Sequence, residues 1–432
     1  MKRYSEYKDS GVKWIGEIPE HWKIEPFGRH FSYGKGLPIT KADLVSEGVA
    51  VISYGQIHSK LNIGTTMDDC LLRYVDPKYI ETNPQCLLNK NDFVFADTSE
   101  DIEGCGNFAF NDRNESIFAG YHTIIVRPID ILHPKYYAYL FQSKKWKSQV
   151  QTLVNGVKVF SISRGILKKA SLLIPTYTEQ QEIVTYLDTK VANIDEYISI
   201  AEKKIAALEE LKQTIIAEAV TRGIHKDVPM KDSGVKWIGM IPEHWKVNKI
   251  RSHFKERRVK VSDKDFQALS VAKIGIVPQL EDACKTDNGD NRKQVLKGDF
   301  VVNSRSDRKG SCGISPLDGS VSLINIVLRP FDIVQEYVHY LFRSYNYIEE
   351  FYRNGRGIVA DLWTTRYSEM RNIQIPVPPL SEQQEIVTYI ETKVANINQL
   401  CQAERSQIEK LKEYKQRLIS DVVTGKLKVT ND

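Results

Sequence analysis

Apolar residues recur every three or four positions along two long stretches of the chain. The first stretch covers residues 179–223, and the second repeats its register at a constant offset of 203 residues. The apolar positions of the first stretch are Val191, Ile194, Ile198, Ala201, Ile205, Leu208, Leu211 and Ile215. This spacing places a narrow apolar stripe along a helix of roughly 60 Å, which needs a partner helix. We therefore expect the two stretches to pair with each other as an antiparallel coiled coil.

Both helical stretches begin with the same eight residues. Positions 179–186 and 382–389 each read Glu-Gln-Gln-Glu-Ile-Val-Thr-Tyr. The stripe is less regular near its middle, where Glu404 stands in the place of Ala201 and lysines occur at 212 and 415. We expect this polar interruption to be either a contact for a partner or a weak point in the paired helices.

A second repeat opens each half of the chain. Residues 8–23 read KDSGVKWIGEIPEHWK, and residues 231–246 differ only in having Met240 where the first copy has Glu17. Glycine and proline interrupt the segment, so it is too broken for a long helix. Its tryptophans are expected to anchor the segment against a core. They are Trp14, Trp22, Trp237 and Trp245.

Two blocks that share a layout but few residues lie between the repeats. Each contains a strand-like run after an aspartate, at residues 92–95 and 299–302, followed by a polar loop that contains glycine. A strand ending in Arg-Pro, a helix, a loop and a final strand then follow in the same order in both blocks. Each block therefore has the mixture of strands and helices, and the size, of a domain.

The order of docking segment, variable block and long helix occurs twice, which indicates a duplicated architecture. We predict an α+β fold with two mixed α/β domains separated by two long antiparallel coiled-coil helices, as a pseudo-two-fold tandem repeat. The blocks would then lie at opposite ends of a rigid rod. The predicted divisions are a first domain at 1–175, a first long helix at 176–224, a second domain at 225–378, and a second long helix with the C-terminus at 379–432.

The composition of the chain indicates where in the cell the protein is expected. The 432 residues include 27% charged and 10% aromatic residues, no signal segment and no apolar run of membrane-spanning length. We expect a cytoplasmic protein with no membrane association. The six cysteines are scattered without metal-ligand spacing, which predicts reduced, mostly buried thiols and no metal site.

The distribution of charge differs between the blocks. Residues 246–355 carry 19 basic and 14 acidic residues, whereas residues 23–156 carry 14 basic and 15 acidic. A single basic cluster is usually a solvated face. Two clusters beside predicted strands favour an anionic partner. The first consists of Lys249, Arg251, Lys255, Arg257, Arg258 and Lys260, and the second of Arg305, Arg308 and Lys309.

No catalytic motif accompanies this layout. The glycines near Lys35 and Lys426 lack the spacing of a phosphate-binding loop. The acidic loop at residues 100–103 has no accompanying histidine or lysine array, and a solvated turn explains it better than a metal site. His21 and His244 recur within the docking segments without a nucleophile beside them. We therefore predict a non-catalytic chain that needs no cofactor.

The chain resembles the DNA-specificity (S) subunits of type I restriction-modification systems over nearly its whole length. The resemblance is carried by the WIGEIPEHW and WIGMIPEHW segments, by the IPTYTEQQEIV and VPPLSEQQEIV transitions, and by the alternation of two unlike blocks with two like ones. It implies two target-recognition domains, a helical spacer and double-stranded DNA as ligand. It also implies recruitment of two adenine-N6 methyltransferase subunits and two ATP-dependent translocase-nuclease subunits.

Under this interpretation, loop residues of the two blocks contact DNA. Arginine can bridge guanine O6 and N7, while lysine and serine more often hold phosphate. The expected contacts of the first block are Tyr54, Gln56, His58, Thr98, Asn155 and Lys158. Those of the second are Lys273, Ser304, Arg305, Ser306, Arg308, Lys309, Asn354 and Arg356. For each block alone, an ordinary solvated loop explains the residues at least as well.

The docking segments and helix starts are the expected contacts for the modification subunits. The residues predicted there are the four tryptophans with Glu179, Gln180, Glu382 and Gln383. The runner-up interpretation is a coiled-coil scaffold that presents two unlike protein-binding modules. An enzyme with an unrecognised site is a third possibility.

Overall fold

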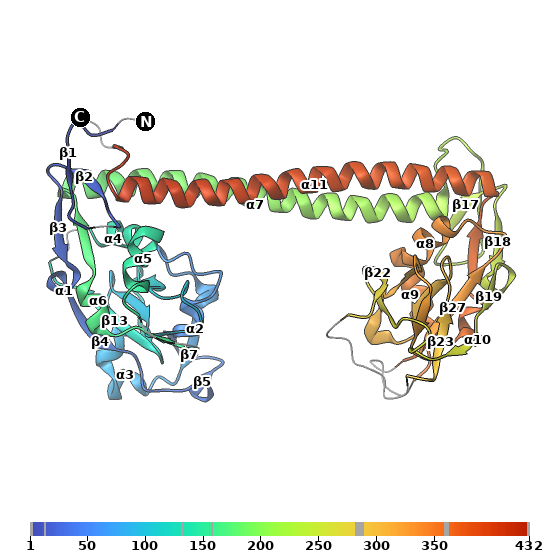
Figure 1. Cartoon of the computed structure of the whole chain (residues 1–432), viewed down its shortest axis with the longest axis horizontal. Helices are drawn as coiled ribbons and strands as arrows, with labels where there is room; N and C mark the ends of the chain where they lie inside the picture. The colour runs from blue at the N-terminus through green and yellow to red at the C-terminus, as the bar shows by residue number, and fades with distance from the viewer. Residues whose placement is uncertain are drawn as a thin grey trace. The chain divides into compact units, whose positions relative to one another are not determined.

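The computed structural model describes residues 3–12, 14–130, 133–154, 156, 159–280, 289–357 and 363–429. The chain divides into two compact units (Figure 1). Unit 1 comprises Met1–Ile200 and Gln407–Asp432, and unit 2 comprises Ala201–Ser406. The four predicted divisions follow chain order and stay a prediction, because the compact units instead divide each long helix.

A four-stranded antiparallel sheet forms the centre of unit 1. Its strand order is β11 (Phe108–Phe110), β9 (Phe93–Ala96), β13 (Thr123–Pro128) and β4 (Phe31–Lys35). All four residues of β9 are buried, which explains its uninterrupted apolar sequence. The strands predicted around residues 92–95 and at the Arg-Pro ending are thus confirmed.

A second sheet of five strands lies in unit 1. Its strand order is β5 (Leu44–Val45), β7 (Arg73–Val75), β6 (Val49–Ile52), β12 (Ile117–Ala119) and β8 (Leu87–Leu88). β6 and β12 are parallel, while the other pairs are antiparallel. A single helical turn, α2 (Tyr54–Ile57), follows β6.

Aromatic side chains fill the space between the first sheet and two helices of unit 1. These helices are α4 (Pro134–Gln142) and α5 (Lys144–Gln151). The ring centroids of Phe141 and Trp146 are 4.4 Å apart, and those of Phe95 and Trp146 are 6.0 Å apart. Close aromatic packing of this kind stabilises a core beyond the effect of buried area alone.

Unit 2 is built on a sheet with the same strand order. That order is β19 (Phe254–Glu256), β27 (Asn325–Pro330), β24 (Phe300–Asn303) and β25 (Cys312–Ile314). The helices α8 (Gln335–Arg343) and α9 (Tyr345–Arg353) correspond to α4 and α5. The core between these helices and the sheet again contains an aromatic pair. The rings of Phe342 and Tyr347 stack with their centroids 4.3 Å apart.

The remaining strands of unit 2 depart from those of unit 1. A three-stranded sheet has the order β20 (Lys260–Val261), β23 (Arg292–Val295) and β26 (Gly319–Val321). A separate hairpin joins β21 (Leu269–Ala272) to β22 (Gly275–Pro278). The parallel bridge between Ala268 and Ser320 places β21 beside β26 as β6 lies beside β12.

The repeated docking segments form matching hairpins. β1 (Tyr7–Asp9) pairs with β2 (Glu17–Pro19), and β16 (Met230–Asp232) pairs with β17 (Met240–Pro242). The next strand in each unit, β3 (Lys23–Pro26) or β18 (Lys246–Lys249), pairs with the last strand before the long helix. Those last strands are β15 (Ser171–Ile174) and β28 (Gln374–Val377).

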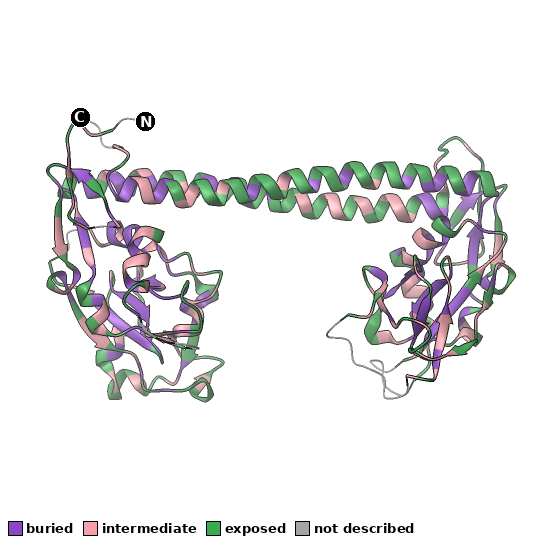
Figure 2. Ribbon diagram, in the orientation of Figure 1, coloured by how far each residue is buried: buried purple, intermediate pink, exposed green. Residues whose placement is uncertain are grey.

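The predicted long helices are α7 (Tyr177–Arg222) and α11 (Leu380–Val423). Figure 2 shows exposed residues along most of both helices, with buried residues at intervals. In unit 2 the contacts run antiparallel, because Lys204 bonds to Glu404 at 2.5 Å and Lys212 to Asn398 at 3.3 Å. In unit 1 Lys415 bonds to Asp195 at 2.5 Å.

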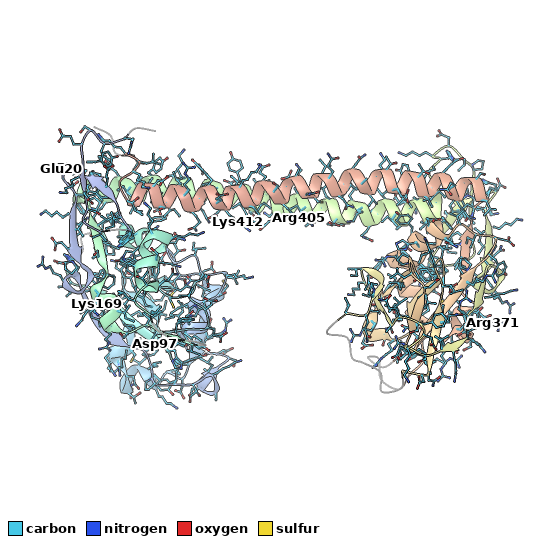
Figure 3. All side chains as sticks on the ribbon, viewed as in Figure 1. Glu20, Asp97, Lys169, Arg371, Arg405 and Lys412 are labelled. Carbon is cyan, nitrogen blue, oxygen red and sulfur yellow. The ribbon has the colours of Figure 1, made fainter. Side chains whose placement is uncertain are left out.

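The polar residues in the middle of the apolar stripe are therefore paired with other side chains of the same chain. Glu404, Lys212 and Lys415, which interrupt the apolar pattern, each have an oppositely charged or amide partner. Arg405, labelled in Figure 3, adds a contact to Glu209 at 3.5 Å. Polar pairs in a coiled-coil seam fix the register at some cost in stability. The predicted α+β tandem fold is confirmed.

Five cysteines fall within the described residues, and all are free thiols. Four of them are buried, as predicted, and Cys70 is exposed. Cys284 lies outside the described residues. Among the residues that the structure describes, no cluster of histidine, cysteine or carboxylate side chains could hold a metal ion. Within the same residues, no helix is long and apolar enough to cross a membrane.

Candidate nucleic-acid interface

Three loops of unit 1 meet at the end of β9. The Tyr54 amide donates to the Tyr121 carbonyl at 3.3 Å, which joins the loop after β6 to the turn before β13. The Asp97 amide donates to the His122 carbonyl at 3.1 Å, and the Ile162 amide donates to the Asp97 carbonyl at 2.8 Å. Asp97 is labelled in Figure 3. Loops held together on a rigid sheet are the usual position of binding residues.

The side chains at this junction form an aromatic cluster. The ring centroid of Tyr54 lies 5.6 Å from Tyr121, 5.4 Å from His122 and 6.2 Å from His58. His122 has a φ of 54°, in the left-handed region that residues other than glycine rarely adopt. Strained backbone of this kind persists where the surrounding structure imposes it, and it concentrates at functional sites.

The described residues of unit 1 that were predicted to contact DNA are all half-buried, and they differ in what their side chains contact. Tyr54 belongs to the aromatic cluster, and the Thr98 hydroxyl donates to Asp97 at 2.7 Å. The Gln56 side chain instead accepts from the Ser53 amide at 3.2 Å and caps α2. Asn155 and Lys158 lie outside the described residues.

His58 is held at both ring nitrogens. Its Nε2 lies 2.8 Å from the Thr98 carbonyl, and its Nδ1 lies 3.1 Å from the Asn107 amide nitrogen. Because both nitrogens are occupied, neither is free to read a base edge. The structure thus gives His58 a supporting place in the junction.

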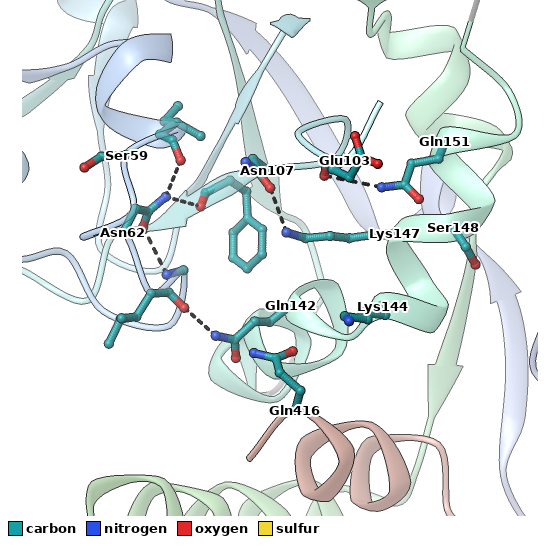
Figure 4. Close-up of a pocket in the computed structure, with 14 residues that line it drawn as sticks. Ser59, Asn62, Glu103, Asn107, Gln142, Lys144, Lys147, Ser148, Gln151 and Gln416 are labelled. Atoms are coloured by element: carbon teal, nitrogen blue, oxygen red, sulfur yellow. Dashed lines mark hydrogen bonds between the residues drawn. The ribbon is translucent and has the colours of Figure 1, made fainter. Parts of the chain in front are cut away.

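A polar cavity of about 620 Å³ adjoins this junction (Figure 4). Lys147 and Gln151 of α5 face Asn107 and Glu103 across it. The Lys147 ammonium group donates to the Asn107 side-chain oxygen at 2.7 Å. Burial lowers the pKa of Lys147 to about 8, because the charged form loses hydration.

In unit 2 the corresponding junction lies at the end of β24. The Thr365 amide donates to the Ser304 carbonyl at 2.9 Å, and the Ser304 hydroxyl donates to the Ile324 carbonyl at 2.6 Å. Arg305 and Arg356 each form a β-bridge with Thr364. Arg305 and Arg356 were both predicted to contact DNA and are distant in sequence, and the structure brings both beside Thr364.

The arginines of this junction are paired only loosely. The side chain of Arg356 is 84% exposed, and that of Arg308 is 67% exposed. Asp307 lies 3.3 Å from Arg305 and 3.6 Å from Arg308. Exposed ion pairs contribute only about 0–1 kcal/mol. The guanidinium groups can therefore exchange these partners for phosphates or base edges.

Tyr352 holds the backbone of the basic loop that contains Arg305 and Arg308. The Tyr352 hydroxyl donates to the Asn303 carbonyl at 3.0 Å and lies 3.3 Å from the Arg308 carbonyl. Burial raises the pKa of Tyr352 far above its usual value, so the phenol remains a donor. Ser306, Lys309 and Tyr352 also line a cavity of about 430 Å³ that includes Trp363.

Several residues predicted to bind DNA have structural roles in unit 2. Ser304 is buried, and the Asn354 amide donates to the Glu350 carbonyl at the end of α9 at 2.8 Å. Arg257, counted in a basic cluster, is bidentate to the buried Asp299 at 2.6 and 3.1 Å. The prediction that this arginine belongs to an anion-binding face is wrong, because its charge is matched inside the fold.

Lys273 lies at the tip of the β21–β22 hairpin. The Arg343 side chain donates to the Lys273 carbonyl at 2.6 Å, so the backbone of the tip is fixed while its lysine is exposed. Ile274 beside it is 77% exposed. β21 corresponds to β6, so Lys273 and Tyr54 both lie in the segments that follow equivalent strands, although Lys273 is in a hairpin and Tyr54 begins α2.

The residues predicted to bind partner subunits are largely internal. Glu179 is buried and accepts hydrogen bonds from His21 at 2.9 Å, Trp22 at 3.3 Å and the Thr176 amide at 3.0 Å. The Gln180 side chain donates to the Pro175 carbonyl at 3.1 Å. These bonds join the start of α7 to the docking hairpin of unit 1.

The second copy keeps two of these contacts in unit 2. Glu382 is buried and lies 2.7 Å from His244, and the Gln383 side chain donates to the Pro378 carbonyl at 2.8 Å. Trp245 is buried and Trp237 packs on Tyr347 at 5.7 Å. Trp14 is half-buried. Internal contacts thus account for these residues, and partner binding by them stays a prediction.

Residues that the sequence interpretation missed complete both junctions. They are Tyr121, His122, Asn107 and Lys147 in unit 1, with Trp363 in unit 2. The signal for Tyr121 and His122 was their position directly before the strand that ends in Arg-Pro. The contact between Lys147 and Asn107 spans 40 residues and leaves no local pattern.

Comparison with known families settles the class of the chain. The profile of the type I restriction modification DNA specificity domain matches residues 33–210 and again residues 259–410. The chain belongs to this family. Specificity subunits of this family are non-catalytic, bind DNA, and partner with methylase and restriction subunits.

Relatives of the chain carry the same description. It is 25% identical to the Methanocaldococcus jannaschii protein assigned as the specificity subunit of the type I restriction enzyme MjaX, over 98% of both chains. It is 23% identical to the MjaVIII specificity subunit of that organism, also over 98% of both. Identity to the EcoKI specificity subunit of Escherichia coli is 21%, over 95% of this chain and 90% of that one.

Solved structures support the fold. A chain from work on complex assembly and conformational transition of the type I R-M system has a TM-score of 0.69 at 16% identity, over 95% of this chain and 99% of that chain. The HsdS subunit from Thermoanaerobacter tengcongensis has a TM-score of 0.54 at 16% identity, over 95% and 98%. Both share the tandem α+β fold of this specificity family.

Proposed function

We propose that the chain directs a type I restriction-modification complex to a bipartite, asymmetric DNA site, with each unit reading one half. One observation carries this proposal. The two units share a four-stranded sheet of identical order, yet the loops at equivalent sheet ends differ in residues and in charge. A reader of a palindrome would need two like surfaces, whereas unlike surfaces suit two different half-sites.

The two junctions favour different base contacts. Unit 2 presents Arg305, Arg308 and Arg356, and arginine discriminates guanine through O6 and N7. Unit 1 presents Tyr54 and His122 beside the Asp97 carboxylate, which lies 3.3 Å from the His122 ring. A carboxylate can accept from the amino group of cytosine. The remaining polar residues of both loops would hold phosphates and so fix the register.

The long helices would set the gap between the half-sites. α7 has 46 residues and α11 has 44, and seam pairs such as Lys204 with Glu404 fix their register. Each residue adds about 1.5 Å to a helix. The number of helical residues would therefore control the distance between the bases that are read.

Catalysis would belong to the partners. Two modification subunits would transfer methyl groups to adenine N6, and two translocase-nuclease subunits would cut unmodified DNA. The docking hairpins and the exposed faces of the long helices would receive the modification subunits. The chain itself would contribute recognition and spacing.

A titration with duplex DNA at increasing salt tests this proposal against the protein-scaffold alternative. DNA binding through phosphates releases counterions, so the affinity of the full chain for duplex DNA should fall steeply with salt. No affinity for any duplex, together with capture of a protein partner by the loops of both units, would support the scaffold instead.

A further inference from the structure

We infer that Lys147 and Asn107 are positioning residues for recognition by unit 1, because they fix His58 in one tautomer and thereby hold the loop that follows β9. The inference rests on the proposed function for its consequence in DNA reading. Its structural part, the state of the His58 ring, can be measured without DNA.

The first step follows from what a lysine can donate. An ammonium group has no acceptor, so the Asn107 atom that faces Lys147 at 2.7 Å is the side-chain oxygen. This orientation turns the amide NH2 of Asn107 toward Nδ1 of His58, 3.1 Å away. Because an NH2 group only donates, Nδ1 must accept and carries no proton.

The other ring nitrogen of His58, Nε2, indicates the same tautomer independently. Nε2 of His58 lies 2.8 Å from the carbonyl oxygen of Thr98, which can only accept. Nε2 therefore carries the proton, and the ring is the neutral Nε2–H tautomer. A proton on Nδ1 would face the Asn107 NH2 group and remove one hydrogen bond.

The position of Lys147 is not required by the fold. Gly106 and Gly310 occupy equivalent places before the outer strands β11 and β25. A Cβ at Gly106 would lie 3.7 Å from Lys147, and a Cβ at Gly310 would lie 3.6 Å from Ile348. An isoleucine thus fills in unit 2 the place that lysine fills in unit 1. Burying an ammonium group is costly, and within the described part of the chain Lys147 has no ion pair.

The hydrogen-bonded chain connects the elements that carry the reading loops. Lys147 lies on α5, His58 ends α2, and Thr98 pairs with Ser161 between β10 (Thr98–Ser99) and β14 (Phe160–Ser161). A Cβ on Gly104 would lie 3.0 Å from Nδ1 of His58, so the loop packs closely on the ring. A change in the ring therefore has to move that loop or α2.

Imidazole ¹⁵N NMR of the full chain tests the structural part. The wild-type ring should show a protonated Nε2 and a bare Nδ1. In Asn107→Asp, an isosteric carboxylate would accept from both Lys147 and His58, so both ring nitrogens should be protonated at pH 7. A wild-type Nδ1–H tautomer, or an unchanged ring in Asn107→Asp, would overturn the inference.

Selection from a randomised duplex library tests the consequence for recognition. In Lys147→Met, base preference should fall about fivefold to tenfold in one half-site only, as for loss of a supporting hydrogen bond. Lys147→Arg keeps a donor and should restore part of that preference. Lys144→Met, on the same helix and also lining the cavity, should alter affinity equally for all duplexes.

The selection can contradict the inference in two ways. Equal loss in both half-sites would indicate a general folding defect, and unchanged preference in Lys147→Met would remove the positioning role. If the wild-type chain itself selects no motif, the proposed function fails and the recognition role fails with it. The NMR result would still decide the tautomer, so the two failures are distinguishable.

Discussion

Buried charges are matched by different residues in the two units. Asp92 and Asp299 both precede the central strand of the sheet, and both are buried. Asp92 is paired with Arg127 of β13 at 3.0 Å, whereas Asp299 is paired with Arg257 after β19 at 2.6 Å. A buried ion pair that loses one partner leaves an uncompensated charge, so each pair constrains the residues around it.

His339 gives unit 2 a sensitivity to acid. Desolvation lowers its pKa to about 4, with a smaller effect of Arg343. The folded state thus disfavours the proton, and the unfolded chain binds more protons between about pH 4 and 6.5. Stability should fall as pH drops through this window. Urea denaturation of His339→Gln should show a shallower loss than wild type, while His225→Gln, an exposed control, should match wild type.

Arg305 and Arg308 should act on one half-site. Replacing both with alanine should relax base preference in the half read by unit 2, with a loss of about 1–3 kcal/mol for each bidentate contact to guanine. Binding assays against duplexes with single-base changes would measure this effect. Preference in the other half should not change. Equal loss in both halves, or no loss, would remove this loop from the interface.

Residue roles could be predicted from the sequence only in part. The repeated Glu179 and Glu382 were recognisable as important because they recur, but their role as acceptors for the docking hairpins required the fold. Arg305 and Arg356 were predicted separately, and their shared neighbour Thr364 was not. Such contacts depend on which loops the sheet brings together, and a local pattern does not encode that information.

Secondary structure followed the pattern of apolar positions wherever the pattern was long or fully buried. α7, α11, β9 and β24 match their predicted positions. The single turn α2 and the β21–β22 hairpin were not predicted, because elements of four residues are too short to show a period. These short elements carry Tyr54 and Lys273, so the least predictable parts of the fold lie at the candidate interface.

The start of α7 depends on Glu179. It accepts from Thr176, His21 and Trp22, and replacing it with glutamine removes the charge from these bonds. We expect Glu179→Gln to lower the stability of unit 1 by about 1–3 kcal/mol in chemical denaturation. Glu20→Gln, an exposed change in the same hairpin, should have little effect. Equal stability of the two variants would contradict this role.

The spacing role of the helices can be tested by shortening them. Deleting seven residues from matched places in α7 and α11 preserves the apolar repeat and removes about 10 Å of helix. The gap in the recognised site should shorten by about three base pairs, at about 3.4 Å each. A motif with an unchanged gap and full affinity would refute the spacing role. Deleting four residues, which breaks the repeat, should instead destabilise the chain.

At the scale of the whole molecule, the duplication supports the proposal that one chain reads two sequences. The docking hairpins, the sheet order and the helix starts are nearly the same in both units, while the loops at the sheet ends have diverged. In the proposed function the shared elements would provide stability and spacing, and the loops would provide specificity. Sequence duplication alone predicted this division, and the family match confirmed the class of protein.

The methylated-adenine motif in cellular DNA tests the central claim most directly. DNA from cells that carry this chain with its modification partner would be sequenced for N6-methyladenine and compared with DNA from cells that lack the chain. We predict a new motif with two unlike specific halves separated by a fixed gap. A palindromic motif, a single uninterrupted motif, or methylation that is the same in both cells would contradict the account.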